Sequence, residues 1–174
     1  MVPLDTCLFV FILIFGLVGA LRGWSREMLV LFAVILALAV RLIFTQYVPI
    51  AKEFLDRPPE EQFYIYSALI ILMALGGYAG PAVSGRLAGV SAREKLQDVL
   101  LGLIIGAING FLIVGSIWYF LDAAGYGLMG IEPPLPNSVA AVLATTYLPP
   151  LWLADAILLT VFSFAAVFVI IVLV

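Results

Sequence analysis

The stretch from Val99 to Leu121 contains no charged side chain and is bounded by Asp98 and Asp122. As an α-helix it is long enough to cross the hydrocarbon core of a bilayer, which is roughly 30 Å thick. The whole chain is 65% hydrophobic and only 11% charged, whereas soluble domains contain about 25% charged residues. The sequence therefore predicts a polytopic membrane protein, and this stretch predicts one of its spanning helices.

Three glycines, Gly102, Gly106 and Gly110, follow one another at intervals of four residues within this stretch. That interval places them on one face of a helix. Each glycine lowers helix propensity by about 1 kcal/mol relative to alanine, but in lipid a stripe of small residues lets two helix backbones pack closely. We therefore expect a packing seam, either inside the protein's own bundle or against a second copy or a foreign subunit.

Four further apolar stretches are candidate membrane spans. They are residues 4–21, 28–44, 63–81 and 151–174. The short connection between the first two requires an antiparallel helical hairpin, and Gly16, Gly19 and Gly23 thin one side of its first helix. We expect a single all-α transmembrane domain over residues 1–174, a helical bundle of about five spans with a glycine-striped fourth helix.

Two parts of this pattern are irregular. The third span ends in a glycine-rich stretch that includes Gly76 and Gly77, so a kink or a partly embedded extension to Leu87 is open. After Asp122 comes a proline-rich segment that contains a shorter apolar stretch, 138–147, with Asn137 as its expected N-cap. This stretch is too short to cross, so it is expected to lie at the membrane surface or to dip in and return.

The basic residues predict the orientation in the membrane. Five of them fall in the first and third loops, namely Arg22, Arg26, Arg86, Arg93 and Lys95. Only Lys52 and Arg57 fall in the second loop. Because cytoplasmic loops are enriched in lysine and arginine, we expect the N-terminus outside and the C-terminus inside.

Two sets of charged residues are expected to meet at the membrane faces. Arg22, Arg26 and Asp98 predict a cytoplasmic charge cluster where the first turn meets the fourth helix. Asp5 and Arg41 fall at the opposite face, about one turn apart in the hairpin register. An ion pair between them would lower the cost of a charge near hydrocarbon, although snorkelling of Arg41 to the headgroups would do the same.

The chemistry available to the chain is restricted. It has no histidine and a single cysteine, Cys7, which removes the commonest general base, the commonest metal ligand and any internal disulfide. The acidic residues are scattered over loops and helix ends, so the sequence offers no catalytic residue, no metal-ligand set and no cofactor site. Asn109 is strongly polar and lies near mid-span, where it is either an interhelical hydrogen-bond former or a pore-lining residue.

Two longer stretches carry a resemblance to a known family. The first is LDTCLFVFILIFGLVGALRGWSREMLVLF, with Asp5 at the helix start and an RG-x-x-RE turn that begins at Arg22. The second is DVLLGLIIGAINGFLIVGSIWYFLD, with Asp98 followed by the three spaced glycines. Together they resemble the colicin V production (CvpA) family of bacterial inner-membrane proteins. Two features depart from its pattern: Asn109 stands where the family often has a basic residue, and the last apolar stretch replaces a polar tail.

The resemblance implies a small integral membrane protein linked to colicin V production, toxin export and envelope homeostasis, and it implies no catalytic residue. We expect a non-enzymatic inner-membrane protein that acts through helix packing and assembly. Its expected partners are the lipid bilayer and either other membrane subunits or further copies; no basic run is present for nucleic acid. An accessory subunit of a larger complex and an oligomeric small-solute channel or transporter stay open as alternatives.

Overall fold

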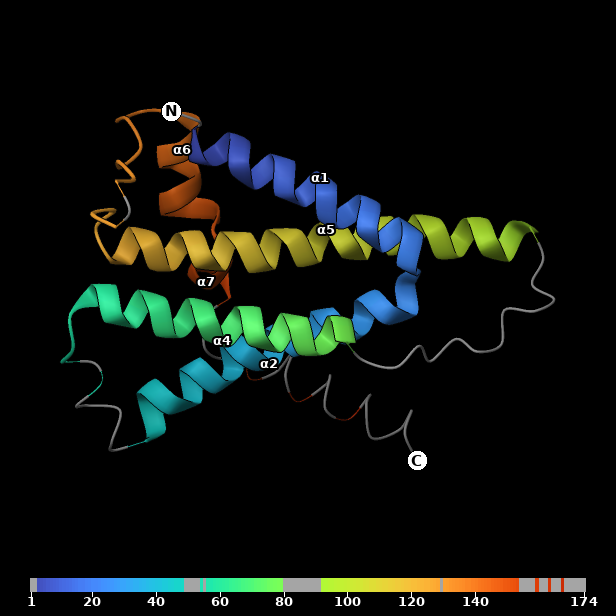
Figure 1. Cartoon of the computed structure of the whole chain (residues 1–174), viewed down its shortest axis with the longest axis horizontal. Helices are drawn as coiled ribbons and strands as arrows, with labels where there is room; N and C mark the ends of the chain where they lie inside the picture. Colours follow the sequence, from blue (N-terminus) through green and yellow to red (C-terminus); the bar gives the residue numbers. More distant parts are fainter. Residues whose placement is uncertain are drawn as a thin grey trace.

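The computed structural model describes residues 3–48, 56–79, 92–128 and 130–153, together with positions 54, 159, 163 and 167. Four long helices account for most of this part of the chain (Figure 1). They are α1 (Leu4–Arg22), α2 (Trp24–Tyr47), α4 (Pro59–Ala79) and α5 (Ala92–Ala123). Each is long and apolar enough to cross a membrane, so the predicted all-helical membrane bundle is confirmed. The predicted span 151–174 lies largely outside the described residues, as does the extension of the third span to Leu87.

The first two helices are joined more tightly than expected. The sequence predicts a polar turn from Arg22 to Glu27, but α1 ends at Arg22 and α2 begins at Trp24, so Gly23 alone connects them. Gly23 has a φ of +86°, a backbone conformation that residues other than glycine rarely adopt. As a result Glu27 lies inside the first turn of α2, where the helix dipole favours a negative charge.

The third span also begins earlier than predicted. Helix α4 starts at Pro59, four residues before the predicted start of this span at residue 63. Proline is well suited to the first turn of a helix, where its missing N–H needs no partner, and Glu60 and Glu61 add favourable charge there. The helix continues through Gly76 and Gly77 to Ala79. Those two glycines therefore lie within a continuous helix.

Helix α5 is the central element of the bundle and contacts α1, α2 and α4. In Figure 1 it runs between α1 on one side and α2 and α4 on the other. One apolar core lies among α2, α4 and α5 and includes Val34, Ile70 and Phe120. A second core joins α1, the end of α5 and the segment after it, and includes Leu8 and Leu148.

The glycine stripe of α5 lies against α1, inside the chain's own bundle. A methyl group added at Gly19 of α1 would lie 2.9 Å from the Cα of Gly106 and closer still to the carbonyl oxygen of Gly102. One added at Gly110 would lie 3.1 Å from the Cα of Ile12. The obstructing atoms at Gly19 are backbone atoms, and at Gly110 they are the Ile12 Cα and the Phe15 side chain. At Gly19 the two helices are therefore as close as glycine alone permits.

The proline-rich segment folds across one end of the bundle (Figure 1). It contains α6 (Val139–Val142), a π-helical turn η1 (Leu143–Tyr147) and α7 (Pro149–Trp152). The expected N-cap was Asn137, but the cap is Ser138, whose Oγ accepts a hydrogen bond from the Ala141 N–H at 3.1 Å. Gly115 of α5 leaves room for Pro149, because a methyl group there would lie 2.7 Å from the proline Cδ. Gly115 is thus one of the points at which the segment packs against α5, beside the apolar contacts of Trp118 and Leu121.

Candidate functional site

A carboxylate lies fully buried where the four long helices meet. Glu27 of α2 is 0% exposed, because the single-residue connection at Gly23 turns the first turn of α2 into the bundle. Its Oε1 forms an ion pair with Arg22 Nη1 at 3.2 Å. Arg22 lies at the last position of α1 and its side chain is 20% exposed, so this charge pair joins the buried carboxylate to the edge of the bundle.

Asn109 of α5 supplies two hydrogen bonds to the same residue. Its Nδ2 donates to Glu27 Oε2 at 2.9 Å and to the Glu27 carbonyl oxygen at 3.0 Å. Asn109 is 0% exposed, and its Oδ1 is buried without a hydrogen-bond partner. Both residues are fully buried, so the protein itself shields these bonds from water.

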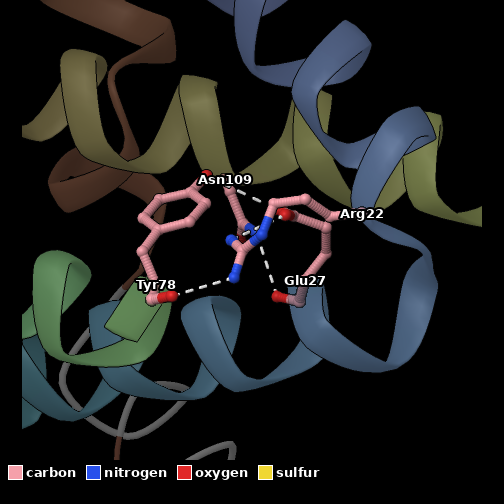
Figure 2. Close-up of polar contacts among 4 residues, drawn as sticks. All are labelled: Arg22, Glu27, Tyr78 and Asn109. Carbon is pink, nitrogen blue, oxygen red and sulfur yellow. Dashed lines mark hydrogen bonds and ion pairs between the residues drawn. The ribbon is translucent and has the colours of Figure 1, made fainter. Parts of the chain in front are cut away.

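Tyr78, near the end of α4, completes the group. Its hydroxyl donates to Glu27 Oε2 at 3.4 Å, and its carbonyl oxygen accepts a hydrogen bond from Arg22 Nη2 at 3.0 Å. The Arg22 guanidinium carbon lies 4.4 Å from the centre of the Tyr78 ring. Figure 2 shows the four side chains converging from α1, α2, α4 and α5. We call Arg22, Glu27, Tyr78 and Asn109 the Glu27 cluster.

The Glu27 cluster is electrically balanced and ties the bundle together. Its one negative charge and one positive charge are within ion-pairing distance, and the carboxylate accepts bonds from three other helices. A buried ionisable group is costly without such partners, and in membrane proteins it commonly marks a functional position. Chemically the cluster can hold four helices in one arrangement, and it offers the bundle interior one proton-accepting group.

The predicted cytoplasmic charge cluster is arranged differently from expectation. Asp98 does reach the first turn, but its Oδ1 accepts a hydrogen bond from the backbone N–H of Trp24 at 3.1 Å. Arg22 is paired with Glu27 instead. No ion pair to Arg26 occurs within the described ranges, and its Nε is buried without a hydrogen-bond partner. The structure therefore brings Asp98 to the backbone of the turn and pairs Arg22 with Glu27.

Asp5 and Arg41 are not brought together either. The Arg41 guanidinium carbon lies 5.0 Å from the centre of the Phe120 ring of α5. Helix α1, which carries Asp5, packs against another part of α5, where Leu8 meets Trp118 and its neighbours. Helix α5 thus lies between the two residues, and no ion pair joins them in the part of the chain that the structure describes.

Sequence reasoning missed Glu27 and Tyr78. The sequence places Glu27 in the short turn between the first two spans and Tyr78 in the glycine-rich end of the third span. The signal that could have found Glu27 was Asn109, because a lone amide near mid-span needs a polar partner on another helix.

The comparisons with known proteins agree with this architecture. The sequence model of the family described as Colicin V production protein matches residues 4–129. Those residues include all four long helices and every member of the Glu27 cluster. Among curated proteins and among solved structures, no match to the chain is found. Since the family match covers well over half of the sequence, the chain belongs to the Colicin V production protein (CvpA) family.

Proposed function

We propose that this protein is a non-enzymatic component of colicin V production and toxin export, with a wider part in envelope homeostasis, that acts by assembling with other membrane polypeptides or with its own copies. The family match and the four apolar helices support the assignment to a membrane process. The distribution of basic residues supports a place in the bacterial inner membrane with the N-terminus outside.

The observation that carries the proposal is that the buried polar groups of the Glu27 cluster bond to one another within the bundle. The members of the Glu27 cluster bond to one another and close the bundle, while α1 has only three buried residues, Leu8, Gly16 and Gly19. A bundle whose helices are joined by internal hydrogen bonds, and whose outer surface is apolar, presents a rigid surface to lipid and to other membrane helices. Such a surface is suited to assembly, since little conformational freedom is lost on association.

A non-enzymatic role makes a direct prediction for the side chains with nucleophilic groups. Cys7→Ala, Ser67→Ala and Ser116→Ala should each restore colicin V export to a strain that lacks the protein, to the level given by the wild-type chain. The measurement is the amount of exported colicin at matched protein levels in the membrane. Loss of export with any one variant at a normal protein level would contradict the proposal and indicate a covalent or acid–base step.

One observation favours transport as a second candidate. Glu27 is a fully buried carboxylate next to the unpartnered Oδ1 of Asn109, and buried acids of this kind form proton relays in pumps and transporters. A transporter carries its solute when it is reconstituted alone in vesicles. A component that acts by assembly does not, so the two candidates differ in what the isolated chain can do.

A further inference from the structure

A second cation lies within α2, well away from the Glu27 cluster. Arg41 is separated from Glu27 along the helix by about 21 Å at 1.5 Å per residue. Its guanidinium carbon lies 4.9 Å from the ring centre of Tyr66, 5.0 Å from that of Phe120 and 5.9 Å from that of Tyr119. We call these four residues the Arg41 cage; Tyr66 comes from α4 and the other two rings from α5.

The charge of Arg41 has no anionic partner in the described chain. No carboxylate forms an ion pair with it there. Its Nε is buried without a hydrogen bond, and the Tyr66 hydroxyl is buried without one as well. The two terminal nitrogens of Arg41 are not among the buried unpaired atoms, and Arg41 as a whole is only partly buried. The guanidinium therefore lies at the edge of the bundle, beside the Tyr66 side chain.

The arrangement of the rings around the guanidinium suits it to bind an oxyanion. Aromatic rings attract the faces of a guanidinium, whereas its N–H donors point outward in the plane, where they match a phosphate in a two-point contact. Arg41 also lies towards the end of the apolar part of α2, which the window Trp24–Thr45 defines. That position corresponds to the level of lipid headgroups rather than to the bilayer centre.

We propose that the Arg41 cage binds the phosphate group of an anionic phospholipid. The rings hold the guanidinium in place, the terminal N–H groups donate to the phosphate oxygens, and the lipid supplies the negative charge that the described chain does not. The proposal is independent of the role in colicin V production. A lipid headgroup and free phosphate share this chemistry, and the experiment separates them.

The test measures binding of phosphatidylglycerol to the purified full-length chain in detergent, by native mass spectrometry. The wild-type protein should retain phosphatidylglycerol in preference to phosphatidylcholine. Arg41→Gln should weaken retention about tenfold, as expected for loss of a charge-assisted contact. Arg41→Lys should bind with intermediate strength, because an ammonium group lacks the planar donor edge.

The matched control is Arg57→Gln. Arg57 is an exposed arginine that pairs with Glu61 in solvent, so its loss should leave lipid retention unchanged. Equal retention of the two lipids by the wild-type chain would overturn the proposal, and so would equal effects of the Arg41 and Arg57 changes. If millimolar inorganic phosphate displaced the lipid completely, the lipid assignment would be wrong and the site would be one for free phosphate. Two measurements on the wild-type chain, the comparison of the two lipids and the competition with inorganic phosphate, test the proposal even if Arg41→Gln fails to fold.

Discussion

Replacing Gly19 by leucine is expected to separate α1 from α5 and to cause the largest loss of stability of any single change in the bundle. A β-carbon at Gly19 would meet the Gly102 carbonyl oxygen and would lie 2.9 Å from the Gly106 Cα. Both are backbone atoms, so no change of rotamer relieves the clash. Overpacked cores typically lose 1–3 kcal/mol through side-chain shifts, and here a helix must move, so we expect a loss of at least about 3 kcal/mol.

The matched control for this prediction is Gly76→Leu. Gly76 also lies within a long helix, but a β-carbon there would have no neighbour within 4 Å. The change should be neutral or should stabilise α4 by up to about 1 kcal/mol through helix propensity. The free energy of unfolding of both variants in detergent or bicelles provides the measurement. Equal stability of the two variants would show that the α1–α5 seam is not as close as described.

Replacing Glu27 by alanine is expected to cause the second large loss. The change leaves the Arg22 charge without its ion-pair partner and removes one of the two acceptors of the buried Asn109 amide, whose bond to the residue 27 carbonyl oxygen stays. Removal of one partner from a buried ion pair typically costs 3–5 kcal/mol, and we expect a loss of about 3 kcal/mol in the free energy of unfolding. Glu27→Gln should lose less, because its carbonyl oxygen still accepts a hydrogen bond from Asn109.

Glu61→Ala is the control that isolates the effect of burial. Glu61 pairs with Arg57 at the same N–O distance, 3.2 Å, but both side chains are 52% exposed. An exposed i,i+4 pair contributes about 0.3–0.5 kcal/mol, so this variant should be close to wild type. A double-mutant cycle between Glu27 and Asn109 would then measure their coupling. Coupling near zero, or equal losses from the two glutamate changes, would contradict the role given to the Glu27 cluster.

Much of the fold follows from local pattern. The uncharged stretches predict the four long helices, because in lipid a spanning backbone must satisfy its own hydrogen bonds. The four-residue spacing of Gly102, Gly106 and Gly110 predicts a face of close approach. The pattern does not say which helix fills that face, because small residues permit contact with any neighbour. The structure assigns it to α1.

Local sequence pattern predicts neither the burial of Glu27 nor the separate positions of Asp5 and Arg41. Glu27 follows Arg26 in a polar hexapeptide, and only the left-handed conformation of Gly23 shortens that hexapeptide into a one-residue connection. A hairpin of α1 and α2 predicts that Asp5 and Arg41 meet, but only if the two helices are direct neighbours along their whole length. The insertion of α5 between them is a tertiary fact that the sequence order of the helices conceals.

The native mass of the protein, extracted in mild detergent from bacterial membranes that are producing colicin V, tests the central claim most directly. We predict a mass larger than that of one chain, made up of further copies or of other polypeptides in a fixed ratio. The same preparation, separated from its partners and placed in vesicles, should show no solute flux of its own. A single chain without partners, or an isolated chain that carries a solute across the vesicle membrane, would contradict a function through assembly.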